Sequence, residues 1–241
     1  CLPLDKIVRK KENFVFPKVI DYACGAGHFL TEAVEAINNY FSVNGNVDAI
    51  RENMWCEHHI YGIEKDYRLA RVAKVSLYMN GAGQGKIKFG DGLEQYTDEQ
   101  ITNSSFDILV ANPPYSVSGF KGHLKLKNNS FDLLKRNLIS NDGSEIETLF
   151  VERIAQLLKP KGIAAVVLPS SILSNDSNSY MCAREIILQF FHLRAVAQFG
   201  SKTFGATGTN TVVLYLEKFN EPPKRREIVK DVVNAILSGK F

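Results

Sequence analysis

The sequence of 241 residues lacks the features that mark several protein classes. Its four cysteines form no Cys-x-x-Cys pair, so the commonest zinc-binding spacing is excluded. No apolar run reaches the roughly 18 residues that indicate a membrane span. The 29 basic and 26 acidic residues leave a net charge of +3, which permits a nucleic-acid partner without arguing for one. What remains is an ordinary globular composition, with 45% hydrophobic residues and length enough for a substantial core.

The cysteines and histidines give no complete metal site. Cys56, His58 and His59 could form half of one, but adjacent histidines point in opposite directions on a strand and no second half exists. We therefore interpret this cluster as structural and expect no metal. The scattered thiols suit a reducing cytoplasm. No signal peptide is visible, and because the chain does not begin with methionine, we expect a fragment whose true N-terminus is missing.

Short apolar runs alternate with helical patterns, which predicts a parallel sheet covered by helices. The predicted strands are 18–21, 59–63, 86–89, 106–111, 163–168, 194–199 and 211–216. Helices are predicted over 29–41 and 147–159, and a third follows a cap at Asp66. The inward positions predicted for that third helix are Leu69, Val72, Ala73 and Leu77. We expect the last two strands to form a hairpin or an antiparallel edge.

Two segments fall outside this alternation. The polar segment 116–144 has no clear periodicity, and a loop of that length is usually functional or disordered. Its basic residues, Lys121, Lys125, Lys127, Lys135 and Arg136, could contact phosphates. The segment 220–241, after Pro222-Pro223, reads as an amphipathic helix. We favour packing of this helix on the same domain over a role as a docking surface.

A glycine-containing turn follows the first predicted strand. It runs from Asp21 to Leu30 and holds Gly25 and Gly27 at the point where a helix begins. Glycines let a ligand approach the backbone there, and the helix N-terminus offers unpaired amides. A dinucleotide-binding fingerprint would need a third glycine at position 30, where this sequence has leucine.

Two acidic residues follow the next two strands. Glu64 ends the second strand, where a carboxylate can accept hydrogen bonds from two ribose hydroxyls. The alternative role of a helix-capping acid fits Asp66 better, which leaves Glu64 for a ligand. Asp91 lies between two glycines after the third strand and could reach the amine of an adenine ring. Alone it would be an ordinary turn.

The most specific signal is Asn112-Pro113-Pro114-Tyr115, directly after the fourth strand. Two prolines remove two amide donors and fix the backbone. The turn therefore presents acceptors, the Asn112 side-chain oxygen and the Pro113 carbonyl, which can hold both hydrogens of one planar amine. Tyr115 supplies a flat face for the ring that carries this amine. Because ligands of open parallel sheets bind beyond the strand ends, these four features should share one site.

Together these motifs resemble those of the amino-methylating, adenine-specific DNA methyltransferases, in particular the modification subunit of type I restriction systems. The segment Asp21 to Leu30 is similar to the family motif D-P-A-C-G-S-G-G-F-L, with departures at Tyr22, Ala26 and His28. Glu64, Asp91 and Asn112–Tyr115 follow in the family's order, and 147–162 and 199–218 resemble its later motifs. The resemblance implies the Rossmann-like fold of S-adenosylmethionine-dependent methyltransferases. Its sheet would be mostly parallel and seven-stranded, with helices on both faces.

The resemblance also implies function. The cofactor would be S-adenosylmethionine and the substrate an adenine flipped out of duplex DNA, methylated at its N6 amine in a prokaryotic cytoplasm. The catalytic residues would be Asn112, Pro113, Pro114 and Tyr115. The cofactor-binding residues would be Asp21, Ala23, Cys24, Gly25, Gly27, Phe29, Glu64, Asp91, Gly92, Leu93 and Asn112. The flipped base would stack on Tyr115 and on Phe204, with Phe199 as the alternative to Phe204.

Domain organisation and partners follow from the same resemblance. We assign 1–219 to a catalytic domain that is truncated at its N-terminus, because the family's F-T-P motif is missing upstream of Asp21. A specificity subunit or recognition domain would read the DNA. Two alternatives stay open: a methyltransferase of glutamine amides in release factors, which shares N-P-P-Y, and a non-catalytic scaffold.

Overall fold

A computed structural model describes residues 4–5, 15–44, 55–83, 85–124, 126, 130–200 and 209–221. Its seven-stranded sheet has the order β3-β2-β1-β4-β5-β7-β6. The strands are β1 (Val19–Asp21), β2 (Ile60–Glu64), β3 (Lys86–Phe89), β4 (Phe106–Ala111), β5 (Leu158–Pro169), β6 (Phe191–Phe199) and β7 (Thr211–Lys218). The longer helices are α2 (His28–Val43), α4 (Tyr67–Met79), α6 (Ile146–Leu157) and α8 (Asn178–Phe190). The short ones are α3 (Cys56–His59), η2 (Thr97–Glu99), η3 (Phe120–His123), α5 (Asp132–Lys135) and α7 (Ser171–Ser174).

The sheet is parallel except at one edge. Strands β3, β2, β1, β4 and β5 run in one direction, and β7 lies antiparallel between β5 and β6. Chain order reverses beside β1, which pairs with β2 on one side and with β4 on the other. Such a reversal opens a crevice at the carboxyl ends of the strands. The predicted fold, including the antiparallel edge, is confirmed.

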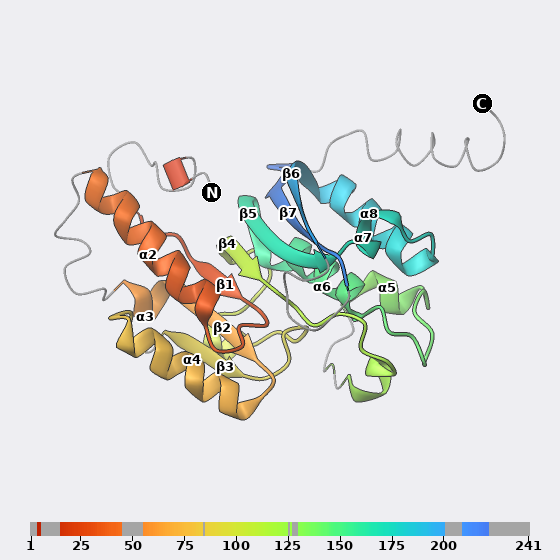
Figure 1. Ribbon diagram of the computed structural model, residues 1–241, viewed down its shortest axis with the longest axis horizontal. Coiled ribbons are helices and arrows are strands. Elements are labelled where there is room, and N and C mark those ends of the chain that lie inside the picture. The colour runs from red at the N-terminus through yellow and green to blue at the C-terminus, as the bar shows by residue number, and fades with distance from the viewer. Residues whose placement is uncertain are drawn as a thin grey trace.

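Alternating residues along the central strands β1, β2 and β4 face opposite layers of helices (Figure 1). Val19, Ile60 and Ile108 pack with buried residues of α2 and α4. Ile20 and Leu109 pack instead with buried residues of α6 and α8. This period of two is the geometry of a strand that is buried on both faces. The sheet is therefore a rigid platform from which the loops at its carboxyl edge project.

Several local predictions were wrong. His59 ends the short helix α3 instead of opening β2, so His58 and His59 lie on a helical turn. In α4 the buried face is Ala70, Ala73 and Leu77, whereas Leu69 and Val72 are exposed. Both sets of positions recur at helical spacing, and the face of Ala70, Ala73 and Leu77 is the one that packs against the sheet.

Other differences concern elements that the sequence pattern did not reveal. Strand β5 begins at Leu158, five residues earlier than predicted, and α8 was not predicted. The segment 116–144 contains the two short helices η3 and α5. The predicted helix 220–241 lies outside the described residues from position 222 onward. Within the described ranges, no helix has both the length and the apolarity to cross a bilayer.

Candidate active site

Backbone hydrogen bonds within the glycine turn and to β2 hold the turn between β1 and α2. The Cys24 amide donates to the Ile63 carbonyl at 3.0 Å, and the Gly27 amide donates to the Cys24 carbonyl at 2.8 Å. Gly25 has a φ of +54°, and a Cβ placed on it would meet nothing within 4 Å. The turn thus leaves an open space in front of the N-terminus of α2, a 16-residue helix whose first amides point outward.

Asp21 lies under this turn as a buried carboxyl group. Its Oδ1 accepts a hydrogen bond from the Ala23 amide at 2.9 Å, and its side chain is 1% exposed. Burial raises the pKa of Asp21 to about 8, against the lowering effect of the Ala23 bond, and the nearby charge of Glu64 raises it further. A buried carboxylate usually needs a cation, and Asp21 forms no ion pair with any residue that the structure describes.

Glu64 connects the end of β2 to the glycine turn. One carboxylate oxygen accepts from the Gly25 amide at 2.8 Å and the other from the Asp66 amide at 2.7 Å. A carboxylate has about four acceptor positions, so about two remain for ligand hydroxyls. The prediction that Asp66 is the cap of α4 is confirmed, since its Oδ1 accepts from the amides of Arg68 and Leu69.

Asp91 lies in the loop after β3. Its Oδ1 accepts from the Leu93 amide at 3.0 Å, and its Oδ2 pairs with the Lys65 ammonium at 2.7 Å. The Lys65 side chain is 62% exposed, so a ligand can displace it at little cost. The next residue is fixed by close packing, because a Cβ on Gly92 would lie 2.1 Å from the Tyr22 carbonyl oxygen. The loop after β3 therefore abuts the glycine turn.

The segment Asn112–Tyr115 follows β4 at the same edge of the sheet. Asn112 and Pro114 are exposed, Pro113 is buried and Tyr115 is half-buried. Asn112 makes no side-chain hydrogen bond to any residue that the structure describes, so its amide oxygen is available to a ligand. β4 pairs with β1 from Ile108 and Leu109, which sets the clamp beside the glycine turn. We call Asn112–Tyr115 the clamp below.

The remaining predicted residues divide into backbone and side-chain contributors. The side chains of Cys24 and Leu93 are buried in the core, so only their backbones face the turn. Burial also raises the pKa of the Cys24 thiol, which keeps it protonated. Phe29 is 40% exposed at the start of α2.

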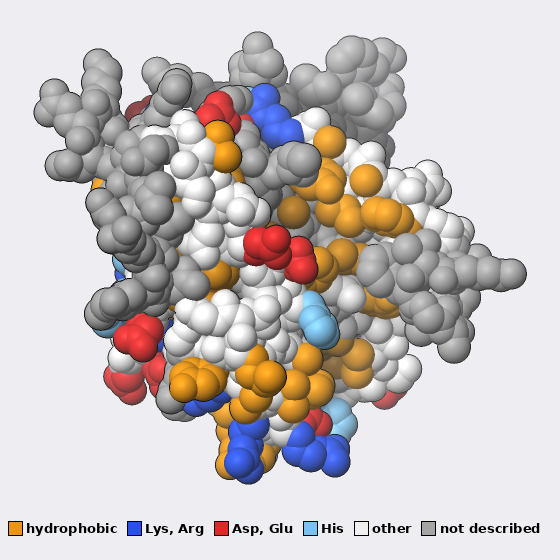
Figure 2. Space-filling model, turned by 60° about the vertical axis from the view of Figure 1, so that its left-hand side comes forward, with side chains coloured by type: hydrophobic (Ala, Val, Ile, Leu, Met, Phe, Trp, Pro, Cys, Tyr) orange, Lys and Arg blue, Asp and Glu red, His pale blue; other side chains and the backbone are white. Residues whose placement is uncertain are grey.

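Tyr67 and Phe89 form an exposed edge-to-face aromatic pair, 5.5 Å between ring centroids, next to Asp66 and Gly90. Figure 2 shows apolar and basic side chains side by side on the molecular face that carries α2 and α4.

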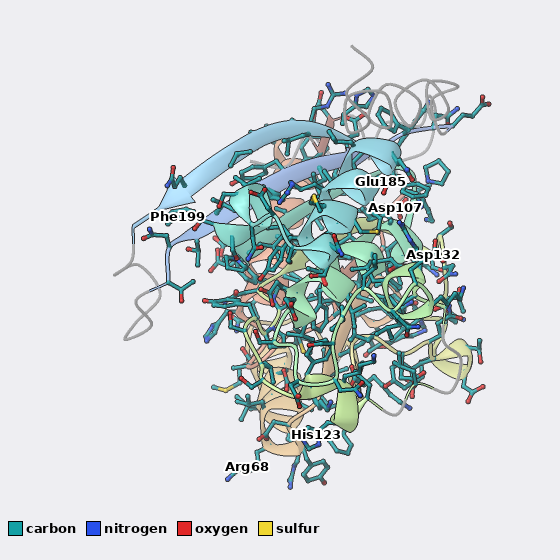
Figure 3. The ribbon with its side chains drawn as sticks, turned by 90° about the vertical axis from the view of Figure 1, so that its right-hand side faces the viewer. Arg68, Asp107, His123, Asp132, Glu185 and Phe199 are labelled. Atoms are coloured by element: carbon teal, nitrogen blue, oxygen red, sulfur yellow. The ribbon has the colours of Figure 1, made fainter. Side chains whose placement is uncertain are left out.

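The second predicted stacking aromatic, Phe204, lies outside the described residues. Its alternative Phe199 is half-buried at the end of β6 (Figure 3). Because β6 and β5 are both antiparallel to β7, the end of β6 lies at the carboxyl edge of the sheet. Phe199 pairs with Thr211, and the Ser170 amide bonds to the Asn210 carbonyl. The described ends of the β6–β7 connection therefore lie at the edge that carries the clamp.

The basic residues of segment 116–144 are engaged within the protein where they are described. Lys121 donates to the Ile139 carbonyl at 3.1 Å. Lys135 pairs with Asp132, and Arg136 pairs with Glu185 across 3.9 Å. Lys125 and Lys127 lie outside the described residues. These exposed pairs are weak, but they reduce the charge that the segment offers to a phosphate backbone.

Sequence reasoning missed the residues that support the site from below. Tyr96 donates to the Asp91 carbonyl and accepts from the Asp91 amide. Glu147 and Arg153 of α6 are fully buried and bond to loops of the site. The sequence carried one usable signal for Glu147, which shares a helical face with Phe150 and Ile154 instead of lying on the polar stripe of α6.

Comparison with known families agrees with this geometry. The model of the family described as N-6 DNA Methylase matches residues 5–235. The chain belongs to this family. The resemblance found in the motifs is thereby confirmed at the level of the family.

Individual relatives are distant. The type II restriction enzyme and methyltransferase RM.Eco57I of Escherichia coli is 27% identical over 84% of this chain and 25% of its own length. The type I restriction enzyme EcoEI methylase subunit of E. coli is 25% identical over 90% of this chain and 42% of its own. The crystal structure of the type I restriction enzyme EcoKI M protein superposes with a TM-score of 0.68 at 21% identity, over 87% of this chain and 42% of that one. The chain thus spans less than half of each of these relatives.

Proposed function

We propose that this chain transfers a methyl group from S-adenosylmethionine to the exocyclic N6 amine of adenine in DNA, as part of a restriction-modification system. The observation that carries the proposal is the clamp. Its exposed Asn112 and its two prolines follow β4 beside the chain reversal at β1, where open sheets bind ligands. Membership of the N-6 DNA Methylase family supports the same reaction.

The residues around the glycine turn fit an adenosine-containing cofactor. Gly25 leaves room for close approach, and Glu64 retains acceptor positions for two hydroxyls. Asp91 would accept from the amine of the cofactor's adenine after Lys65 moves aside. When bound, S-adenosylmethionine supplies an electrophilic methyl group on a positively charged sulfur.

The clamp would act on the target amine. The Asn112 side-chain oxygen and the Pro113 carbonyl would each accept one hydrogen of the amine, which draws the nitrogen lone pair out of the ring system. Tyr115 would stack on the base and offset part of the energy of flipping it, about 1–3 kcal/mol for one stacked base. The described site contains no evident general base, so rate enhancement would come from proximity and orientation.

DNA reading would fall to a specificity subunit or to a recognition domain elsewhere in the protein. The methylase subunits named among the relatives belong to type I restriction enzymes. A cytoplasmic location in a prokaryotic cell is part of the same proposal.

The clamp assignment is tested by Asn112→Ala in the full-length natural protein. We expect methyl transfer to DNA to be abolished while the Kd for S-adenosylmethionine changes much less, because Asn112 contacts the target amine. Asn80→Ala is a matched control, since Asn80 is an exposed asparagine between α4 and β3, at the opposite edge of the sheet. Transfer at a near-native rate by Asn112→Ala would contradict the assignment. Transfer to release-factor protein instead of DNA would favour the glutamine-amide alternative, and transfer to neither substrate would favour a scaffold.

A further inference from the structure

Helix α6 carries three of the four charged residues that are buried among the described residues. The four are Asp21, Glu147, Glu152 and Arg153. A buried charge is tolerated only when it is paired or hydrogen-bonded. Each charge of α6 meets this need by bonding to backbone groups of a different loop. The helix is therefore connected to the active-site loops by directed bonds as well as by apolar packing.

Glu147 reaches the loop that leaves the clamp. Its Oε2 accepts from the Ser116 amide at 3.1 Å, and its Oε1 accepts from the Tyr180 hydroxyl of α8. Ser116 follows Tyr115 directly and has a φ of +56°, a left-handed conformation that non-glycine residues rarely adopt. The bond to Glu147 holds the backbone in this conformation and thereby fixes the direction of the chain at Tyr115.

Arg153 reaches the loop that carries Asp91. Its Nε donates to the Gly92 carbonyl at 3.2 Å, a second nitrogen donates to the Glu94 carbonyl, and a third donates to Gln156 at 3.0 Å. Within the same loop the Leu93 amide bonds to the Asp91 carboxylate. The guanidinium group thus binds the carbonyls on both sides of the residue whose amide orients Asp91.

Glu152 holds the segment between these two loops. Its oxygens accept from the amides of Asp132 and Leu133 at 2.6 and 3.2 Å, at the start of α5. Along α6, Glu147 thus holds the residue after the clamp, Glu152 holds the start of α5, and Arg153 holds the loop that carries Asp91, called the cofactor loop below. One rigid helix connects loops that come from the ends of β4 and β3.

We infer that α6 sets the distance between the methyl donor and its acceptor, with Glu147 as the positioning residue of the clamp and Arg153 as the positioning residue of the cofactor loop. The inference rests on the proposed function, because it assigns substrate and cofactor to those two loops. Neither side chain touches a reacting atom. Each acts through backbone groups, Glu147 through Ser116 and Arg153 through Gly92 and Glu94.

The test compares two variants of the full-length protein, one expected to lower the rate of methyl transfer and the other expected to lower the affinity for the cofactor. Glu147→Met keeps the chain length and loses both acceptors, so neither Ser116 nor Tyr180 keeps its partner. We expect single-turnover methyl transfer at saturating cofactor to fall by about a hundredfold, the effect of a small misplacement, with Kd for S-adenosylmethionine nearly unchanged. Arg153→Met keeps the chain length and loses all donors. We expect its Kd to rise by about tenfold, as for one charge-assisted hydrogen bond, with a smaller effect on transfer at saturation.

Each variant contains its own folding control. Cofactor binding by the Glu147 variant and methyl transfer by the Arg153 variant should change least, and both require a folded domain. Tyr180→Phe is the matched control for Glu147, since it removes one donor to the carboxylate and leaves the Ser116 bond. We expect only a small fall in transfer. If Glu147→Met or Arg153→Met fails to fold, Glu147→Asp and Arg153→Lys replace them, and the same division of effects is expected at smaller size.

Two results would overturn the inference. The first is a parallel loss of cofactor affinity and transfer rate in both variants, which indicates a helix that only stabilises the domain. The second is native behaviour of both variants. Failure of the proposed function itself looks different, because the wild-type protein would then transfer no methyl group to DNA, while the effect of Arg153→Met on cofactor binding would still be measurable by calorimetry.

Discussion

Replacing Asp21 with asparagine should change how stability depends on pH. Asp21 is 1% exposed, and burial raises its pKa to about 8, well above the ordinary value of 3.8. Asparagine keeps an oxygen at the position that accepts from the Ala23 amide. The variant therefore removes the ionisable group without removing the hydrogen bond.

The size of the effect follows from proton linkage. Above about pH 4 the unfolded chain has lost the Asp21 proton, whereas the folded protein keeps it up to about pH 8. Folding takes up a proton in this window, so stability falls as pH rises, by at most roughly 1.4 kcal/mol per pH unit. Between about pH 5.5 and about pH 7.5 the wild type should lose up to about 3 kcal/mol that Asp21→Asn does not lose.

The assay is urea unfolding of both proteins at these two pH values. Taking the difference between the proteins cancels the contributions of other groups, such as His59, whose pKa is lowered by burial. Asp66→Asn is the control, because backbone hydrogen bonds from Leu69 and Arg68 lower the Asp66 pKa. Asp66 is thus ionised in both states throughout this window, and its loss should weaken the protein equally at both pH values. Identical pH dependence of Asp21→Asn and the wild type would refute the reasoning.

A buried carboxyl that has no cation among its described neighbours is a feature expected at a ligand site more than in a core. A positively charged cofactor nearby would lower the Asp21 pKa, so binding near pH 7 should release protons. Calorimetry in buffers of different ionisation enthalpy measures this release, and Asp21→Asn should abolish it.

Two further variants test the stacking aromatic and the packing of the loop after β3. Phe204→Ala should weaken capture of the flipped adenine by about 1–3 kcal/mol, measured as lost fluorescence of 2-aminopurine at the target position. A fluorescence signal that survives this change but disappears in Phe199→Ala would identify Phe199 as the stacking residue. Gly92→Ala should lower both stability and cofactor affinity, because its Cβ would clash with the Tyr22 carbonyl. Gly122→Ala is the control and should change neither, because a Cβ at Gly122 would meet open space. Melting temperatures and Kd values that shift equally in the two variants would contradict the close-packing argument.

The sheet and the placement of the motifs could be predicted because their signals are local. A buried parallel strand reads as a continuous apolar run, as in Phe106–Ala111, and the polar residues that follow it must lie at the carboxyl edge. The role of Asp66 as a cap was predictable for the same reason, since a cap bonds within three residues of itself.

The supporting contacts could not be predicted because they join residues far apart in the sequence. Ser116 and Glu147 are separated by 31 positions, and Gly92 and Arg153 by 61. A charge in a helical pattern is usually solvated, so the burial of Glu147 and Arg153 depends on the packing of α6 under loops with no periodicity. The pairing of Asp91 with Lys65 is likewise decided by the position of the loop after β3.

The central claim is that the methylated atom is N6 of adenine. The most direct measurement reacts the full-length protein and its specificity partner with duplex DNA and isotopically labelled S-adenosylmethionine, then digests the DNA to nucleosides and separates them by mass spectrometry. We expect the label in N6-methyldeoxyadenosine and none in the DNA from the Asn112→Ala reaction. Label in N4-methyldeoxycytidine, or in a glutamine side chain when release-factor protein is offered alongside the DNA, would contradict it.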